Sequence, residues 1–282
     1  MDIQLLKTIV CVADVGSFSK AADVMNCVQS NITGRIKRLE AHYNQTIFER
    51  GRGGARLTPF GLTLCERAKY LIAEFDQAER ELMDTANHAA PLRLGAMETT
   101  AAARLPHVLK ELRQSCPKSK VSLRTGPTAT LLTLLWEQQI DACFVAAPID
   151  ESRFKSTFAF TEKLMKVTAE EQEASGPLLV FSKGCSYRSL SENWLRSQGR
   201  LDTEVIEMGS FEGILGCVEA GMGFAVLPHV VLLPHIKSRD LVSKPLPEPY
   251  CTVETRLATR FGTEDIHSLQ QLRMILAEKK AA

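Results

Sequence analysis

The stretch from residue 60 to about residue 87 constrains the fold of this chain more than any other feature. It contains no proline and a single glycine, Gly61. Its apolar residues fall at alternating spacings of four and three: Leu64, Ala68, Leu71, Phe75, Ala78 and Leu82. This heptad spacing predicts one long helix whose apolar stripe requires a partner helix. The simplest partner is the same helix of a second subunit, and the alternative is that the stripe packs on the helix's own domain.

A helix of this length divides the 282 residues into a short and a long part. We therefore expect one domain over residues 1–59, a linker helix over 60–88 and a larger domain over 89–282. The larger domain is expected to form two lobes, the first from about 92–161 with 237–282, the second from about 162–236. Such a chain is long enough for two or three hydrophobic cores.

Composition excludes several classes of protein. No run of ~18 uncharged apolar residues exists, and residues 1–15 carry Asp2, Lys7 and Asp14 within an amphipathic pattern rather than a signal-peptide layout. We therefore expect a cytoplasmic protein that does not act on membranes. The eight cysteines form no CxxC pair and no closely spaced set with histidine, which favours reduced thiols and predicts no bound metal or cofactor.

Three short helices are predicted before residue 44. Apolar residues between Leu5 and Val15 recur at helical spacing, and Gly16 is a typical helix end. Ser17 or Ser19 is suited to begin a second helix, which we expect over residues 20–25. After a turn at 26–28, a third helix over 29–43 is expected to bury Ile32, Ile36 and Leu39. Two short helices joined by a tight turn are typical of a helix-turn-helix.

The third helix and the residues after it are basic. From residue 29 to 58 six basic side chains stand against two acidic ones, a net +4, whereas the whole chain carries only +1. Glycines between residues 51 and 54 favour a tight turn between two short strands, which predicts a basic wing. Double-stranded DNA is the partner that this pattern favours. The candidate contacts are Gln29, Ser30, Asn31, Thr33, Arg35, Lys37, Arg38, Arg50, Arg52 and Arg56.

Within this set, Gln29, Ser30 and Thr33 are best placed to read bases, because the first turn of such a helix enters the major groove. The arginines would hold phosphates. The alternative is a helical bundle with a solvated basic face.

The ordered motifs of this part resemble a known family. They are Gly-Ser-Phe-Ser at 16–19, Ala-Ala at 21–22, Gln-Ser at 29–30, Ile-Phe-Glu-Arg at 47–50 and Leu-Thr-Pro-Phe-Gly at 57–61. Together they resemble the N-terminal domain of LysR-type transcriptional regulators. The resemblance implies a winged helix-turn-helix, DNA as a partner, and dimers that grip two half-sites. It leaves both a dimer and a homotetramer open, and adds RNA polymerase as a further partner.

The long part alternates between short runs rich in β-formers and helical patterns. The first series is 92–97, 99–116, 121–125, 128–138 and 142–146, and the second is 178–181, 187–197, 204–208, 211–220 and 224–227. This alternation predicts α/β units in two similar lobes. Ligands of such sheets lie at the carboxyl ends of the strands. We therefore expect a small-molecule site, and the candidate residues are Glu98, Thr99, Thr100, Thr128, Ser182, Tyr187, Arg188, Ser210 and Phe211.

The long part also resembles the periplasmic-binding-protein-like effector domain of the same family. Leu-Arg-Leu-Gly at 92–95 and Gly-Met-Gly-Phe-Ala-Val-Leu-Pro at 221–228 carry this resemblance. It implies that Thr99, Thr100 and Thr128 contact the effector, although threonines at these places also serve as helix caps. Cys-Ser-Tyr-Arg at 185–188 is similar to a subset of the family in which some members respond to amines or polyamines.

The effector's charge remains open between two chemistries. Glu98 favours a cationic amine, whereas Arg188 and the helix N-termini favour a carboxylate. An amine, a polyamine or an amino-acid-like metabolite is the resulting expectation. The alternative mechanism is a redox response through Cys185, whose pKa a helix N-terminus and Arg188 would lower, with Cys217 as its resolving partner. Buried, inert cysteine is the competing interpretation.

Two rival functions differ in class. An enzyme would need a catalytic motif, and the sequence has no GxSxG, no P-loop and no HExxH, while its six histidines lack ligand spacing. A structural interaction protein would not need a basic wing. A regulator that binds DNA and an effector, and that is not an enzyme, is therefore the interpretation we favour.

Overall fold

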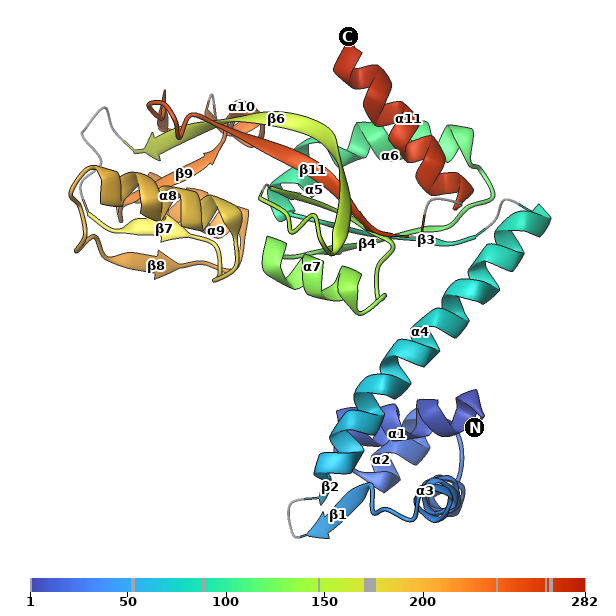
Figure 1. Ribbon diagram of the computed structural model, residues 1–282. Helices are drawn as coiled ribbons and strands as arrows, with labels where there is room; N and C mark the ends of the chain where they lie inside the picture. The colour runs from blue at the N-terminus through green and yellow to red at the C-terminus, as the bar shows by residue number, and fades with distance from the viewer. Residues whose placement is uncertain are drawn as a thin grey trace. The chain divides into compact units, whose positions relative to one another are not determined.

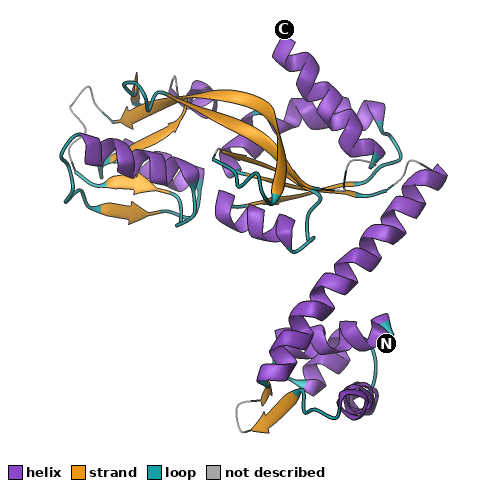
Figure 2. Ribbon diagram, viewed as in Figure 1, coloured by secondary structure: helices purple, strands orange, loops and turns teal. Residues whose placement is uncertain are grey.

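We describe the protein from a computed structural model, which describes residues 2–51, 54–87, 90–146, 148–169, 176–236, 238–261, 263 and 266–281. The chain divides into two compact units, Met1–Arg80 and Glu81–Ala282 (Figure 1). The first is mainly helical and the second combines helices with a large sheet (Figure 2). Across the described residues, no helix combines the length and apolarity needed to span a membrane.

The first unit begins with three helices, α1 (Ile3–Val15), α2 (Phe18–Val24) and α3 (Gln29–Tyr43). Asp2 caps α1, which ends at Gly16 with a left-handed φ of 65°. Ser17 caps α2 by accepting a hydrogen bond from the amide of Lys20, so this helix begins two residues before the predicted start. Ile32, Ile36 and Leu39 of α3 are buried, which confirms the predicted inner face of that helix.

A two-stranded hairpin follows, formed by β1 (Phe48–Gly51) and β2 (Gly54–Leu57) in antiparallel register. The Glu40 carboxylate of α3 accepts a hydrogen bond from the Ile47 amide at 2.9 Å, which ties the start of the hairpin to that helix. The amide of Ala55 donates to the carbonyl of Gly16 at 2.9 Å. The hairpin therefore packs on the end of α1, at the place where the sequence predicts a wing.

Helix α4 (Pro59–Asn87) confirms the long helix that the heptad spacing predicts. Thr58 begins it: its hydroxyl donates to the Thr46 carbonyl at 2.7 Å and accepts from the Gly61 amide at 2.9 Å. A side chain at Gly61 would place a Cβ 2.2 Å from the Ile47 carbonyl oxygen, so only glycine allows this approach. These contacts explain the Leu-Thr-Pro-Phe-Gly motif.

The second unit contains one sheet in the order β4-β3-β5-β11-β6-β9-β7-β8, with β10 paired to β6. Its strands are β3 (Leu92–Ala96), β4 (Val121–Thr125), β5 (Ala142–Ala146), β6 (Phe154–Thr168), β7 (Leu178–Val180), β8 (Val205–Glu207), β9 (Phe224–Pro228), β10 (Val242–Pro245) and β11 (Thr252–Arg260). Its helices are α5 (Glu98–Ala103), α6 (Leu105–Ser115), α7 (Thr128–Trp136), α8 (Ser186–Ser197), α9 (Phe211–Glu219), α10 (His229–Ile236) and α11 (His267–Ala281).

Two parallel strand groups form the two lobes. In lobe I, β3 pairs in parallel with β4 and β5, and in lobe II, β7 pairs in parallel with β8 and β9. Strand β6 belongs to both lobes, because residues 154–163 run along β11 and residues 164–168 pair with β9 or β10. The two lobes are thus one continuous sheet joined along β6 (Figures 1 and 2).

Candidate functional site

The first turn of α3 presents polar side chains to solvent. Gln29, Ser30 and Asn31 are exposed, and Thr33 is half-buried. Lys37 and Arg38, about two turns further along the helix, are exposed as well. The buried stripe of this helix holds it in place, so its exposed face can meet another macromolecule without unfolding.

Arg35 differs from the other candidate DNA-contacting cations whose side chains are described. Arg35 is half-buried, and its guanidinium donates to the hydroxyl of Thr8 in α1 at 3.3 Å, so it also braces α3 against α1. In the hairpin, Arg56 of β2 is exposed. Arg52 lies outside the described residues, and the side chain of Arg50 is likewise not described.

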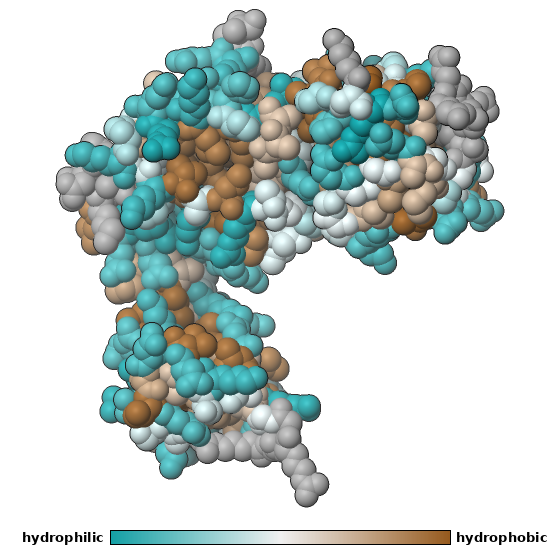
Figure 3. Space-filling view, turned by 180° about the vertical axis from the view of Figure 1, so that it is seen from behind, coloured by the Kyte–Doolittle hydropathy of each residue, from teal (hydrophilic) through white to brown (hydrophobic). Residues whose placement is uncertain are grey.

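The apolar stripe of α4 changes character along the helix. Leu64 and Ala68 are buried among the core residues of the first unit, so these two are not free to meet a partner. Leu71, Phe75, Ala78 and Leu82 are exposed, Leu82 to 72%. Figure 3 shows apolar patches between hydrophilic residues on the surface of the first unit. Packing on the helix's own domain therefore accounts for the start of the stripe and leaves the rest available.

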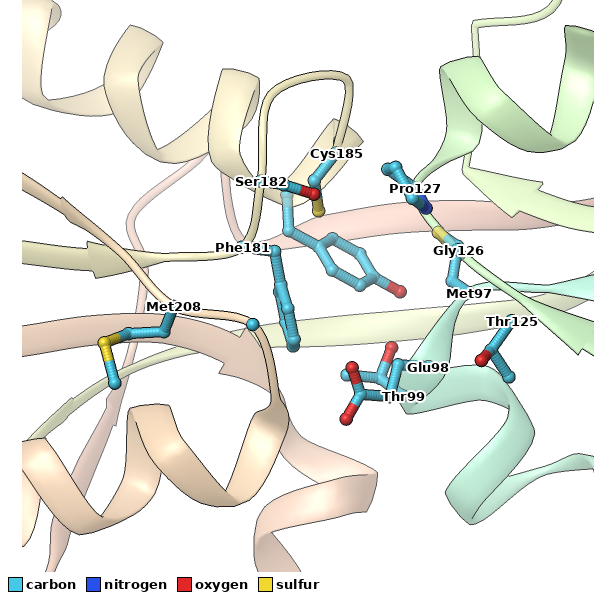
Figure 4. A pocket seen from close by; sticks show the side chains of 12 residues that line it. Met97, Glu98, Thr99, Thr125, Gly126, Pro127, Phe181, Ser182, Cys185 and Met208 are labelled. Atoms are coloured by element: carbon cyan, nitrogen blue, oxygen red, sulfur yellow. The ribbon is translucent and has the colours of Figure 1, made fainter. Parts of the chain in front are cut away.

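A cavity of about 170 Å³ lies between the two lobes of the second unit. Lobe I contributes its strand ends and the start of α5, and lobe II contributes the segments that follow β7 and β8 (Figure 4). The lining residues are Met97, Glu98, Thr99, Thr125, Gly126, Pro127, Phe181, Ser182, Cys185, Tyr187, Met208 and Gly209. This is the edge at which ligands bind in sheets of this kind.

Four of the nine candidate effector residues line this cavity: Glu98, Thr99, Ser182 and Tyr187. The hydroxyls of Thr99 and Tyr187 are buried, and neither has a hydrogen-bond partner of normal geometry among the described residues. Burial raises the pKa of the Tyr187 phenol despite the approach of the Thr99 and Thr255 hydroxyls, so it stays neutral. These hydroxyls offer neutral hydrogen-bonding groups to a ligand.

The other five candidates lie outside the cavity lining. The hydroxyl of Thr128 accepts a hydrogen bond from Ser186 across the lobes at 2.9 Å, and Thr100 is buried in α5. Ser210 caps α9 by accepting from the Gly213 amide at 3.1 Å. Phe211 packs its ring in the core of lobe II. None of the three threonines is an N-cap, since Met97 and Pro127 hold those positions in α5 and α7.

Arg188 does not point its charge into the cavity. Its guanidinium donates to Glu192 at 2.8 Å and to Glu207 at 2.7 Å. Both partners are on lobe II, one turn along α8 and in β8. The guanidinium that would favour a carboxylate ligand is therefore engaged elsewhere.

Sequence reasoning missed most of the apolar lining. The apolar part of the lining comes from Met97, Phe181, Met208, Gly126 and Pro127. In Figure 4, Phe181 lies between Met208 and the polar groups. These residues lie directly after strands, and that position was the signal that could have identified them.

The environment of Cys185 disfavours the reactive thiolate form of its side chain. Burial raises its pKa, although the amides of Tyr187 and Arg188 face the sulfur and oppose that shift. The expectation of a lowered pKa at this cysteine is therefore wrong, and the structure favours the buried, inert interpretation.

Comparison with known proteins agrees with this architecture. Residues 3–62 match the model for the bacterial regulatory helix-turn-helix protein, lysR family, and residues 86–281 match the LysR substrate binding domain. The chain belongs to the LysR family of transcriptional regulators. Its relatives of this family are named as regulators of transcription, so the protein is a DNA-binding regulator with an effector-binding domain and not an enzyme.

Two of the similar curated proteins are from Bacillus subtilis (strain 168). The HTH-type regulator YusT, described as uncharacterized, is 35% identical over 90% of this chain and 88% of its own length. The HTH-type transcriptional regulator GltR is 32% identical over 93% of this chain and 92% of its own length.

Solved LysR-type structures share the fold. Full-length CbnR complexed with its target DNA has a TM-score of 0.72 at 17% identity, with 99% of each chain covered. A full-length OxyR variant from Pseudomonas aeruginosa has a TM-score of 0.68 at 24% identity, covering 98% of this regulator and 97% of that chain. At these identities the likeness concerns the fold alone.

Proposed function

We propose that this regulator binds duplex DNA as a homodimer through α3 and the β1–β2 hairpin, and that a small molecule in the interlobe cavity modulates the binding. The observation that carries the proposal is the exposed polar first turn of α3, which is braced by a buried apolar face and followed by exposed cations. A rigid helix of this kind suits the major groove. The proposal places the protein in the cytoplasm with its DNA.

The exposed part of the α4 stripe is the proposed dimer contact. Leu71, Phe75, Ala78 and Leu82 continue the heptad spacing beyond the residues that the first unit buries. A second copy of the same helix would cover them. Pairing of dimers into tetramers and contact with RNA polymerase belong to the same proposal, and both rest on the resemblance to the family.

Salt-dependent DNA binding tests the proposal. Genomic footprinting first identifies an operator, and fluorescence anisotropy then follows its binding between low and high salt. Each phosphate contact contributes ~0.9 to the slope of log affinity against log salt. Arg38→Ala should therefore reduce the slope by about one and weaken binding to all sequences alike. Lys118→Ala, an exposed lysine of the second unit, is the matched control and should change nothing.

Base reading has a separate signature. Gln29→Ala should relax the preference at one base position by ~1–3 kcal/mol and leave the salt slope unchanged. If the purified regulator ignores duplex DNA even in dilute buffer, the proposed function is wrong.

We infer further that the effector is an amine, a polyamine or an amino-acid-like metabolite. Among the described residues that line the cavity, Glu98 carries the only formal charge, and an ammonium group is its natural partner. The ligand would shift the two lobes relative to each other and so change how paired subunits place their DNA-binding domains. Small-angle scattering with and without ligand should differ, and identical profiles would count against this mechanism.

A further inference from the structure

Each helix N-terminus that faces the cavity from α7, α8 and α9 already has a partner within the protein. In α7, the Ala129 amide donates to the Gly184 carbonyl at 3.2 Å. In α8, the first amides face the sulfur of Cys185. In α9, Ser210 accepts from the Gly213 amide, and a Glu98 oxygen accepts from the Phe211 amide at 2.9 Å.

In α7, α8 and α9, these contacts use amides that would otherwise attract an anionic ligand. A helix N-terminus binds anions because its first amides are unsatisfied and its dipole is positive. Here carbonyl, thiol, hydroxyl and carboxylate groups of the protein face or accept hydrogen bonds from these amides. Since Arg188 is also engaged by two glutamates, the cavity offers a carboxylate ligand no described cationic side chain.

Glu98 connects the ligand site to the arrangement of the lobes. It begins α5 in lobe I, yet its Oε1 holds the first amide of α9 in lobe II, 113 residues away in sequence. This hydrogen bond leaves the second carboxylate oxygen for a ligand, because a carboxylate has about four acceptor positions. Figure 4 shows Glu98 beside Thr99, across the cavity from Ser182.

Apart from Glu98 the lining of the cavity is neutral, and part of it is polar. Thr99 and Tyr187 contribute the buried hydroxyls described above, both without a partner of normal geometry. A ligand with a neutral hydrogen-bonding group would give the Tyr187 phenol a partner besides the neighbouring Thr99 and Thr255 hydroxyls. The cavity of about 170 Å³ is smaller than the ~300–1,000 Å³ of sites for drug-sized ligands, which indicates a compact molecule.

We propose that the cavity selects a compact monocation, a primary amine with a neutral hydroxyl or amide end, and that Glu98 is the residue that determines this specificity. Glu98 receives the ammonium group while it holds α9 through the Phe211 amide, so the bound ligand favours the joined arrangement of the lobes. This inference rests on the proposed function of the cavity as the effector site, and it narrows the class of ligand.

Calorimetry on the full-length regulator with probes of similar size tests the specificity. The probes are 3-amino-1-propanol, 1,4-diaminobutane, the zwitterion β-alanine and uncharged 1,3-propanediol. We expect 3-amino-1-propanol to bind at least tenfold more tightly than each of the others. Tighter binding of the diamine, the zwitterion or the diol would overturn the proposal, and so would failure of both amines to bind.

Two substitutions separate the charge of Glu98 from its hydrogen bond. Glu98→Gln keeps an oxygen that can accept from Phe211 and removes the charge, so it should weaken the amino alcohol at least tenfold while the fold stays intact. Glu212→Gln is the matched control, because Glu212 follows Phe211 in the first turn of α9 but is exposed and pairs with Arg239. Equal binding by wild type and Glu98→Gln would overturn the assignment.

Hydrogen exchange reports on the lobe contact. The amides of 211–216 should exchange more slowly when 3-amino-1-propanol is bound, and faster in ligand-free Glu98→Ala than in Glu98→Gln. Faster exchange on ligand binding would overturn the clamping role. Duplex binding is measured on the same preparations. If the regulator binds DNA but not the amine, only the present inference is wrong. If it does not bind DNA, the proposed function is wrong.

Discussion

At the scale of single residues, the backbone conformation and close packing of Gly54 allow no side chain. Gly54 in the wing has a φ of 96°, a conformation that side chains rarely adopt. A Cβ at this position would lie 2.5 Å from the Gly16 carbonyl oxygen, next to the hydrogen bond that joins the hairpin to α1. Gly54, the first residue of β2, therefore permits this packing as well as the turn.

Gly54→Ala should destabilise the first unit by ~1–3 kcal/mol, because both strain and a backbone clash must be relieved. Urea unfolding followed by circular dichroism measures the change. Gly34→Ala is the control: Gly34 lies inside α3, and a Cβ added there would meet nothing within 4 Å, so alanine should be neutral or stabilise by up to ~1 kcal/mol. Similar losses in both variants would contradict the argument.

Cys185 should react slowly with electrophiles. Its raised pKa keeps the thiol protonated at neutral pH, and the thiolate is the reactive form. At about pH 7.5, mass spectrometry should find alkylation by iodoacetamide slower than for a thiol in an unstructured peptide. Cys185→Ser should leave the response of the regulator to oxidant unchanged. Alkylation faster than in the peptide would restore the redox hypothesis.

At the scale of elements, α4 has two tasks in one apolar stripe. Its first turns complete the core of the helix-turn-helix, where Leu64 and Cys65 are buried. Beyond them Phe75 is 42% exposed, with the Lys7 ammonium 5.9 Å from its ring centroid. The regular spacing of apolar residues thus predicts one helix, although the groups that contact its apolar stripe change along the helix.

Phe75→Glu should weaken dimerisation on the order of 100-fold, because a charge would then face the apolar surface of the partner helix. Sedimentation equilibrium over a range of protein concentrations measures this. Leu62→Glu is the control, since Leu62 is exposed on the side of α4 opposite the stripe. A dimer that survives Phe75→Glu unchanged would place the interface elsewhere.

At the scale of the whole molecule, the continuous sheet explains how the two lobes can respond to one ligand. Strand β6 pairs with β11 in lobe I and continues into pairs with β9 and β10 in lobe II. Glu162 lies on this strand and is buried, and Arg104 at the end of α5 donates to both of its oxygens at 2.9 and 3.0 Å. The helix that bears Glu98 is thereby anchored to the strand that joins the lobes.

Ligand and operator should influence each other to the same extent. If the amine changes operator affinity by some factor, the operator must change amine affinity by that factor, with about 5–150-fold as the typical range. Calorimetry of 3-amino-1-propanol with and without a saturating operator duplex measures one side, and anisotropy of the duplex with and without amine measures the other. Amine affinity unaffected by the operator would contradict effector control of DNA binding.

The sequence alone was enough to predict the helix-turn-helix, the wing, the long helix and the alternation of strands and helices. These features depend on local periodicity, on capping residues such as Ser17 and on turn glycines, all of which act within a few residues. The split of the predicted helix over 99–116 into α5 and α6 is a local exception, and Pro106 at the start of α6 accounts for it.

Tertiary structure decided which polar residues share the cavity. Glu98 meets Phe211, Thr128 meets Ser186, and Arg188 turns to Glu207, all through pairings between segments that the sequence separates. Long-range packing, including the strand pairing along β6 and between β7 and β8, sets these distances, and no periodic pattern encodes it. The predicted residues after strands therefore included four of the twelve lining residues, and only the packing of the two lobes distinguished residues that face the cavity from those that hold the lobes together.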